Sequence, residues 1–339
     1  MSTLSRLDQI KSILADLNQP AFRLQQILTA IYQENILDYQ KMSNLPLILR
    51  NTLKAKLGTV LFLKKIKQSE GAIAKKILLE TRDGAQIESV MTKKDPFVCV
   101  SSESGCNLGC RFCSTGTMGL RKKLTADEIT DQVLYFKVYD QFQGHLTFMG
   151  MGEPLMNPDN VFAAIRIFTD KNCFGYSDRK ISLSTVGIIP EIKRFTKLFP
   201  QINLAFSLHS PFDNQRSELM PVNKLYPLKQ VMSVLTEHLK LTKRKIFIAY
   251  LLLNNVNDSP EHSQALVKLI KSQGRLNYLY HVNLIQFHTY KERFEFQRSS
   301  PEKLRAFGQI LTANHVDFTV RKSFGEDIQA ACGQLCLGK

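Results

Sequence analysis

The sequence predicts an α/β protein, an incomplete parallel (β/α)6 barrel that carries a small helical domain at its N-terminus. From residue 97 onward, short apolar segments alternate with amphipathic ones about six times, as is typical of β-α units joined by right-handed crossovers. The first 70 residues show helical periodicity instead. No dinucleotide-binding glycine fingerprint follows a predicted strand, which favours a barrel over a doubly wound sheet.

Residues 1–70 form the predicted helical domain. One apolar face of its first helix consists of Leu4, Leu7, Ile10, Ile13 and Leu14, and residues 21–32 repeat the pattern. Lysines gather near the end of this domain, at Lys54, Lys56, Lys64, Lys65 and Lys67. Such a run is usually a solvated face. Because the whole chain is basic, an RNA-contacting surface is the alternative that we carry forward for this accessory domain.

Residues 71–95 are predicted to form a β-hairpin that connects the helical domain to the barrel. Its strands, 76–81 and 86–92, flank Asp83-Gly84, a residue pair that tight hairpin turns favour. Glu88 lies on the second of these strands. No linker rich in Pro or Gly follows, so we expect the barrel domain to begin directly afterwards, to cover residues 96–339 and to end in a segment that carries Cys332.

The barrel domain contains seven predicted strands and six predicted helices. The strands are 97–101, 145–149, 180–185, 202–207, 245–253, 280–287 and 317–322. The helices are 129–142, 158–169, 189–198, 228–241, 260–272 and 301–315, and Thr125 and Glu128 form a capping box before the first. Barrels of parallel strands place their chemistry at the C-terminal ends of the strands, where we therefore expect the functional residues.

Charge and composition limit the functional classes. The chain has 339 residues, 44% of them hydrophobic, and its 45 Lys and Arg against 30 Asp and Glu give a net charge of +15. This excess indicates a polyanionic partner, above all nucleic acid, and a merely solvated basic surface is the alternative. Arg6, Asp8 and Lys11 interrupt any apolar run near residue 1, and the longest such run, 248–253, is too short to span a bilayer. We expect a cytoplasmic protein that does not bind membranes and whose seven cysteines are reduced.

Three cysteines, Cys106, Cys110 and Cys113, are spaced C-x3-C-x2-C with an aromatic residue between the last two. A structural zinc site normally has four protein ligands, and no further Cys or His lies within thirty residues downstream. Three thiolates suit an iron–sulfur cluster whose fourth iron stays free to bind a small molecule. A zinc knuckle that takes a distant fourth ligand is the alternative.

Glycines and polar residues follow three of the predicted strands. Met149-Gly150-Met151-Gly152-Glu153-Pro154 begins at the last residue of strand 145–149 and continues directly after it, where the backbone can approach a ligand and a carboxylate or carbonyl can bind an ammonium group. Ser184-Thr185 and Ser207-Leu208-His209 end two further strands, where hydroxyls and an imidazole can hold a ribose or a carboxylate. A simple glycine turn and caps of the following helices are the alternative interpretations.

These motifs resemble the radical S-adenosylmethionine (SAM) superfamily, in which three cysteines hold a 4Fe-4S cluster that binds SAM. The longer strings VSSESGCNLGCRFCSTG, FMGMGEPLMNP and ACGQL resemble the family of 23S rRNA adenosine 2503 methyltransferases that comprises RlmN and Cfr, and the similarity covers essentially the whole chain. It implies a partial barrel of radical SAM type with Cys106, Cys110 and Cys113 as cluster ligands. The residues implied to bind SAM are Gly152, Glu153, Ser184, Ser207, Leu208, His209 and His288, the last in place of an expected Asn.

The resemblance also implies a mechanism that uses two SAM molecules per turnover. Cys332 corresponds to the cysteine that one SAM methylates, Cys99 to the cysteine that resolves a covalent RNA adduct, and Glu88 to the proton acceptor. A second SAM yields the 5′-deoxyadenosyl radical, which takes a hydrogen from the cysteine-bound methyl group. Adenine C2 and C8 are electron-poor carbons, whereas a thiolate attacks a sulfonium methyl readily, so a route through cysteine is chemically reasonable. Product release leaves a Cys99–Cys332 disulfide that a reductant must reset.

The phrases STVGIIP, FSLHSP and SFGEDI resemble the Cfr branch, which implies methylation at C8 and resistance to antibiotics that bind the peptidyl transferase centre. Methylation at C2 of the same adenosine, as in RlmN, with or without action on transfer RNA, is the alternative. A zinc-stabilised RNA-binding protein without catalysis and a radical SAM enzyme acting on a small molecule are hypotheses from other classes. The implied partners are 23S rRNA, free or in early assembly intermediates, an electron donor of flavodoxin or ferredoxin type, and a dithiol reductant, and we expect a monomer.

Overall fold

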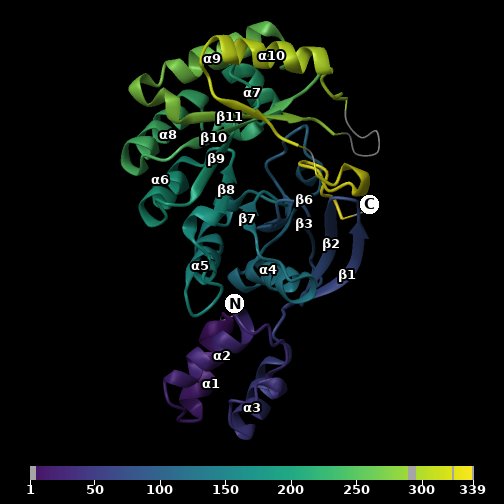
Figure 1. Ribbon diagram of the computed structural model, residues 1–339, viewed down its shortest axis with the longest axis vertical. Helices are drawn as coiled ribbons and strands as arrows, with labels where there is room; N and C mark the ends of the chain where they lie inside the picture. The colour runs from purple at the N-terminus through teal and green to yellow at the C-terminus, as the bar shows by residue number, and fades with distance from the viewer. Residues whose placement is uncertain (1–4, 289–294, 323, 338–339) are drawn as a thin grey trace.

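The computed structural model describes residues 5–288, 295–322 and 324–337, and its N-terminal end is a separate unit of three short helices (Figure 1). The helices are α1 (Arg6–Asp16), α2 (Phe22–Tyr32) and α3 (Leu47–Leu57). The hydroxyl of Ser5 accepts a hydrogen bond from the N–H of Asp8 and so caps α1. Ile10, Ile27 and Leu53 are fully buried in an apolar cluster that also includes Leu134 and Cys173 of the larger part.

A ten-stranded sheet forms the scaffold of the larger part. Its first three strands are an antiparallel meander of β1 (Leu63–Glu70), β2 (Ala74–Thr81) and β3 (Gln86–Thr92). Seven parallel strands follow in sequence order: β4 (Phe97–Cys99), β7 (His145–Phe148), β8 (Ile181–Thr185), β9 (Asn203–Ser207), β10 (Ile246–Leu252), β11 (Tyr280–Gln286) and β12 (Phe318–Val320). β1 and β12 are the two edges of this sheet, and the parallel strands joined by helical crossovers confirm the predicted incomplete barrel.

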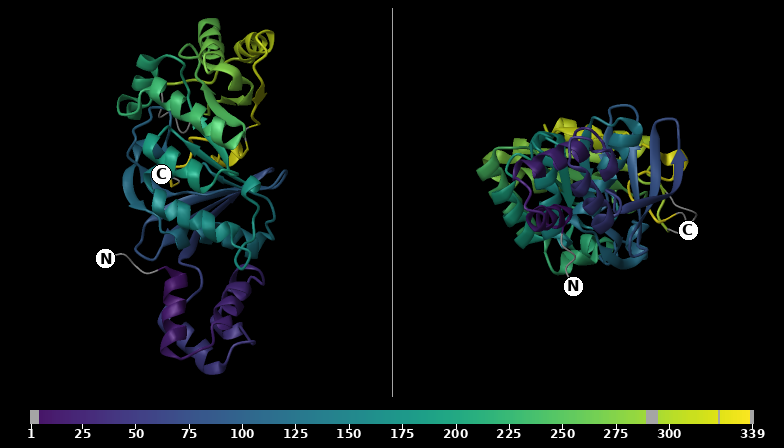
Figure 2. Two further views of the ribbon diagram at one scale, coloured as in Figure 1. Left: turned by 90° about the vertical axis from the view of Figure 1, so that its left-hand side faces the viewer. Right: turned by 90° about the horizontal axis from the view of Figure 1, so that it is seen from below.

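Helices cover the outer face of the parallel strands (Figures 1 and 2). They are α4 (Ala126–Asp140), α5 (Pro158–Thr169), α6 (Ile189–Leu198), α7 (Asp213–Leu219), α8 (Leu228–Thr242), α9 (Pro260–Lys271) and α10 (Pro301–Ala313). The predicted capping box is confirmed, because Thr125 and Glu128 exchange both of its hydrogen bonds. Within the described ranges, no helix has the length and apolarity needed to cross a membrane.

The sequence does not predict helix α7 or the hairpin of β5 (Glu103–Cys106) and β6 (Gly119–Lys123). Seven residues are too few to reveal a helical period, and the hairpin strands mix Gly, Ser and Cys with charged residues and show no clear alternation.

The prediction that the helical domain extends to residue 70 is wrong, because residues 63–70 form strand β1. β1 pairs with β2 through backbone hydrogen bonds, and an edge strand tolerates lysines on both faces. The predicted hairpin of β2 and β3 is confirmed, and Gly84 in its turn has a φ of +81°. β3 in turn pairs with β4, Val90 opposite Cys99, so the hairpin is continuous with the barrel sheet.

A buried ion pair joins the helical unit to the barrel. The guanidinium of Arg6 lies 2.6 Å from the carboxylate of Asp131 on α4 and donates to the Tyr32 hydroxyl at 2.9 Å. The backbone N–H of Arg6 donates to Asp127 at 2.7 Å, and the N–H of Phe62 donates to the second oxygen of Asp131 at 2.6 Å. Burial raises the pKa of Asp131 to about 6, although Arg6 acts in the opposite direction. Because either charge would be stranded without the other, this pair fixes the helical unit on the barrel.

Candidate active site

The hairpin of β5 and β6 positions three cysteines in a cavity that it forms with the ends of β8, β9 and β10. Cys106 ends β5, and Cys110 and Cys113 lie in the following loop, where the N–H of Cys113 donates to the carbonyl of Cys110 at 3.1 Å. Gly105 has a φ of +79°, and a Cβ there would lie 1.9 Å from the carbonyl oxygen of Gly119. Only glycine lets the hairpin close at this point.

The three thiols suit a cluster of several irons. They line one cavity of about 180 Å³, which we call the triad cavity. Burial raises the pKa of Cys106 to about 12, and it also raises the pKa of Cys110 and of Cys113. Such thiols ionise when a metal supplies the positive charge. Among the described residues, no three His, Cys, Asp or Glu side chains are close enough to hold one ion. A 4Fe-4S cluster takes one thiolate per iron, so the donor set fits it without meeting at a single point.

The loop after β7 forms another wall of the triad cavity. Gly152 has a φ of +90°, and a Cβ there would lie 2.5 Å from the Cβ of Glu103. The N–H of Glu153 donates to Glu103 at 3.1 Å, and the Glu153 carboxylate accepts the N–H groups of Val186 and Leu155, each at 3.0 Å. Burial raises the pKa of Glu153 to about 7. The Glu153 side chain therefore ties this loop to the end of β8, and the loop can offer backbone groups to an ammonium ligand.

Polar side chains at the ends of β8 and β9 complete the cavity. The hydroxyls of Ser184 and Ser207 lie 3.3 Å apart. His209 also lines the cavity, and its Nδ1 accepts the N–H of Leu251 at 3.0 Å. Burial, with a smaller effect of a nearby arginine, lowers the pKa of His209 to about 3, so the ring is neutral and carries its proton on Nε2. Leu208 is buried and does not line the cavity, but its N–H bonds to the carbonyl of Ala249 and fixes the turn.

Arg216 on α7 is a positioning residue that the sequence analysis does not identify. Its buried guanidinium donates to the carbonyls of Val186 at 2.7 Å, Ser207 at 3.0 Å and Leu208 at 3.1 Å. One side chain therefore holds the ends of β8 and β9 together beneath the triad cavity. A lone arginine in a short polar helix gives no sequence signal for this role.

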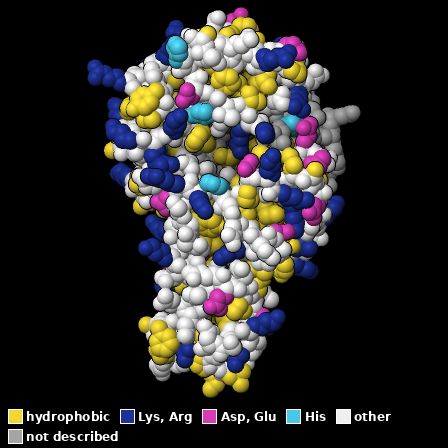
Figure 3. Space-filling model, in the orientation of Figure 1, with side chains coloured by type: hydrophobic (Ala, Val, Ile, Leu, Met, Phe, Trp, Pro, Cys, Tyr) yellow, Lys and Arg dark blue, Asp and Glu magenta, His cyan; other side chains and the backbone are white. Residues whose placement is uncertain are grey.

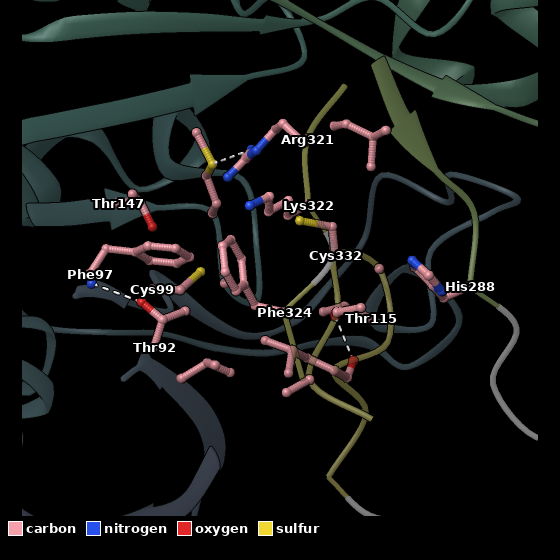
Figure 4. Close-up of a pocket in the computed structure, with 18 of the residues that line it drawn as sticks. Thr92, Phe97, Cys99, Thr115, Thr147, His288, Arg321, Lys322, Phe324 and Cys332 are labelled. Carbon is pink, nitrogen blue, oxygen red and sulfur yellow. Dashed lines mark hydrogen bonds between the residues drawn. The ribbon is translucent and has the colours of Figure 1, made fainter. Parts of the chain in front are cut away.

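Cys99 and Cys332 line a second pocket of about 140 Å³, the Cys99–Cys332 pocket, which adjoins the triad cavity (Figure 4). Cys99 ends β4, whereas Cys332 is exposed on residues 330–337, which we call the C-terminal segment. Ser114 donates its N–H to the carbonyl of Gly333 at 2.8 Å, which holds this segment against the triad loop. Both cysteines are free thiols, and burial, followed by the nearby Cys332, raises the pKa of Cys99 to about 12.

Glu88 is buried beside the C-terminal segment and lines neither of these two spaces. One of its oxygens accepts the N–H groups of Cys336 at 2.8 Å and Leu337 at 3.1 Å, and the other lies 2.9 Å from Nζ of Lys76. His288 lines the Cys99–Cys332 pocket, not the triad cavity, and its Nδ1 lies 3.0 Å from the carboxylate of Glu326.

Two family models match the chain. The radical SAM superfamily model matches residues 100–267, which include the three cysteines and the strands that face them. The model of the ribosomal RNA large subunit methyltransferase N-terminal domain matches residues 4–58, which end before β1.

Individual proteins are similar over nearly the full length of the chain. Ribosomal RNA large subunit methyltransferase Cfr of Lachnoclostridium phytofermentans is 46% identical, covering 98% of this chain and 97% of that protein. The protein of the same name from Staphylococcus aureus is 44% identical, covering 98% and 96%. Among solved structures, a radical SAM methyltransferase from Sphaerobacter thermophilus is 35% identical, with a TM-score of 0.91 and coverage of 98% and 97%.

Proposed function

Because the chain belongs to the family of ribosomal RNA large subunit methyltransferases within the radical SAM superfamily, we propose that it methylates C8 of adenosine 2503 in 23S rRNA. The enzyme uses a 4Fe-4S cluster and SAM. The relatives named Cfr support the C8 position and antibiotic resistance as the outcome. The observation that carries the proposal is the Cys99–Cys332 pocket, in which two free thiols from distant parts of the chain line one space beside the triad cavity.

In this proposal the triad cavity holds the cluster and SAM. Cys106, Cys110 and Cys113 supply the three thiolates, and the bound cluster with SAM supplies a radical that removes one hydrogen atom. The bare backbone of Gly152 and the adjoining Glu153 accept the ammonium group of SAM. The hydroxyls of Ser184 and Ser207 and the Nε2–H of His209 contact the rest of the molecule, with Leu208 fixing the turn and His288 approaching from the neighbouring pocket.

Cys332 carries the transferred carbon in the proposed reaction. Its thiolate attacks the methyl of one SAM, so an S–CH3 bond forms and S-adenosylhomocysteine leaves. After one hydrogen atom is removed from the S-methyl group, the methylene carbon bonds to C8. The resulting radical adduct then loses the ring proton and one electron, which the oxidised iron–sulfur cluster held by Cys106, Cys110 and Cys113 would accept. Glu88 accepts this proton once the C-terminal segment has moved off its carboxylate. Cys99 then attacks the sulfur of Cys332, which forms a disulfide and releases a carbon that takes a proton to become the methyl group.

The excess of positive charge supports an RNA partner. The net charge is +15, and the molecule is hollowed near the middle of one face, with Lys and Arg side chains around the hollow (Figure 3). We assign the three-helix unit to RNA contact, together with the exposed Lys64, Lys65 and Lys67 of β1. A monomeric cytoplasmic enzyme would further need an electron donor of flavodoxin or ferredoxin type and a dithiol that reduces the Cys99–Cys332 disulfide.

Isotope labelling tests the position of methylation. The reduced holoenzyme is incubated with SAM and unmodified 23S rRNA that carries deuterium at C8 of its adenosines, and the nucleosides are analysed by mass spectrometry. C8 chemistry gives 8-methyladenosine that has lost the deuterium, and C2 chemistry gives 2-methyladenosine that keeps it. Cys332→Ala should form neither. A cluster-loaded enzyme that methylates no adenosine would overturn the proposal.

A further inference from the structure

A groove lies beside the Cys99–Cys332 pocket and shares the lining residues Arg321, Lys322 and Phe324 with it. The groove has a volume of about 520 Å³, and its other charged lining residues are Lys94, Arg298 and Glu326. These residues come from the turn after β3, the strand-like stretch before α10 and the chain after β12. We call this space the basic groove. A molecule bound in the basic groove can therefore extend into the pocket that holds the two cysteines.

The basic groove carries more positive charge than its own acid can neutralise. Four cations face one carboxylate, because Glu326 is the only acidic residue among the described residues that line it. Glu326 lies 3.6 Å from Arg298, and its carboxylate lies 3.0 Å from Nδ1 of His288. Lys94 and Lys322 are exposed, and in the described ranges neither forms an ion pair. The groove is therefore suited to an anion with several charges in a row.

Two aromatic rings, those of Phe97 and Phe324, lie where the basic groove joins the Cys99–Cys332 pocket. The ring of Phe324 packs edge-on against Phe97, with the ring centres 5.6 Å apart. Both rings line the pocket, and in Figure 4 the ring of Phe324 lies between the sulfur atoms of Cys99 and Cys332. A flat apolar surface between two reactive sulfur atoms suits a planar heterocycle, because every nucleobase can stack on an aromatic face.

We infer that the basic groove binds the RNA phosphates next to the target adenosine, and that Phe324 stacks on its base after the base has turned out of the RNA helix. This inference rests on the proposed function and assigns the residues that present the substrate. A base inside a duplex could not lie between Cys99 and Cys332, so it must leave its stack. Phosphate contacts fix the register of the strand. The aromatic contact holds the base by stacking and does not depend on which base it is.

Salt dependence tests the phosphate contacts separately from the chemistry. Binding of an RNA fragment of 23S rRNA, with the target adenosine in its natural loop, is measured for the holoenzyme by filter binding at several salt concentrations. Each lost single-strand phosphate contact should reduce the slope of log Kd against log salt by about 0.7, so Lys94→Ala and Arg298→Ala should each do so. Lys197→Ala, an exposed lysine on the outer helix α6, is the matched control and should leave the slope unchanged.

Stacking is tested with a second RNA that lacks the target base but keeps its sugar and phosphates. Phe324→Leu keeps apolar packing against Phe97 and removes the ring face, so it should weaken binding of the intact fragment about tenfold. Phe324→Tyr should restore it. On the abasic RNA, Phe324→Leu should bind as well as the unaltered enzyme.

The outcomes separate this inference from the proposed function. If the unaltered enzyme methylates the fragment while both groove variants keep the full salt slope, the groove does not bind phosphate. If Phe324→Leu weakens binding equally on the intact and abasic RNAs, the base does not stack there. If no adenosine is methylated, the proposed function fails, whatever the binding measurements give.

Discussion

The carboxylate of Glu88 accepts the backbone N–H of Cys336 at 2.8 Å, so a side chain of β3 holds the segment that carries Cys332. Lys76 strengthens this anchor, because its Nζ lies 2.9 Å from Glu88 and donates to the carbonyl of Gln329 at 2.9 Å. Both side chains are buried. In this conformation the proposed proton acceptor is a structural anchor for the segment that must deliver the methyl group.

Replacing Glu88 by Gln should loosen the C-terminal segment. The amide cannot neutralise Lys76, and hydrogen bonds to a charged acceptor contribute about 1.5–3 kcal/mol, so amide exchange in residues 330–337 should accelerate about tenfold or more. Hydrogen–deuterium exchange with mass spectrometry measures this change. Glu70→Gln, whose carboxylate pairs with Lys93 at the exposed sheet edge, is the control. An unchanged exchange pattern in Glu88→Gln would contradict the anchor.

Replacing Cys99 by Ala should trap the enzyme on its substrate. Cys332 would still carry the carbon and bond it to the base, but no thiol would attack the resulting thioether. A denaturing gel should show a nuclease-sensitive adduct for Cys99→Ala and none for Cys332→Ala or the double variant. If Cys99 were only a packed residue, its loss would cost about 1 kcal/mol of stability and leave turnover intact. Multiple turnovers by Cys99→Ala without an adduct would exclude the assigned role.

Replacing Cys110 by Ala should abolish reductive cleavage of SAM and leave the fold in place. Its thiol lies on the loop of the small β5–β6 hairpin and belongs to the apolar core cluster of the sheet and its helices, from which alanine removes only a single sulfur atom. The expected result is loss of 5′-deoxyadenosine with a thermal unfolding curve close to that of the metal-free enzyme. Cys173→Ala is the control, since this buried cysteine lines neither the triad cavity nor the Cys99–Cys332 pocket. Retained cleavage in Cys110→Ala would argue against the triad.

Release of the RNA adduct should accelerate as pH rises. The pKa of Cys99 is raised to about 12, so at neutral pH only a small fraction is thiolate, and this fraction grows about tenfold per pH unit. An adduct formed at pH 7 and then shifted to pH 8 or 9 should therefore decay about tenfold faster per unit. Quantifying the adduct band over time gives the rate. A rate independent of pH would show that thiolate formation at Cys99 does not limit release.

Replacing Arg6 by Ala should destabilise the protein by about 3–5 kcal/mol, because the buried Asp131 would lose its counter-ion. Chemical denaturation measures the free energy of unfolding. Arg305→Ala removes an exposed pair with Glu302 and should cost less than about 1 kcal/mol. If both substitutions lowered the free energy of unfolding equally, the buried pair would not be what fixes the three-helix unit on the barrel.

Much of the barrel could be predicted because its elements repeat a strong local pattern. α5 and α6 begin and end at the predicted residues, and the bounds of the predicted barrel strands lie within two residues of the observed bounds. β1 could not be predicted, because Lys64, Lys65 and Lys67 show no apolar alternation and the strand depends on backbone pairing with β2.

The candidate site is less visible in the sequence, because its geometry depends on contacts between distant residues. The cysteine spacing identified the residues that line the triad cavity, and the resemblance pointed to Cys99 and Cys332, which the structure places in one pocket. No pattern could show that Glu88 is bound by Cys336, or that Arg216 holds two strand ends. These contacts form only when the chain has folded.

The buried pair of Arg6 and Asp131 holds the three-helix unit at a fixed position relative to the barrel. If the three-helix unit contacts RNA as proposed, an RNA bound to α3 and to the Cys99–Cys332 pocket at once must present its adenosine at one fixed distance from α3. The enzyme would thus select a folded RNA in which the segment that contacts α3 and the target adenosine lie at the required distance from each other. A short oligonucleotide with the right sequence would bind at the pocket without contacting the three-helix unit.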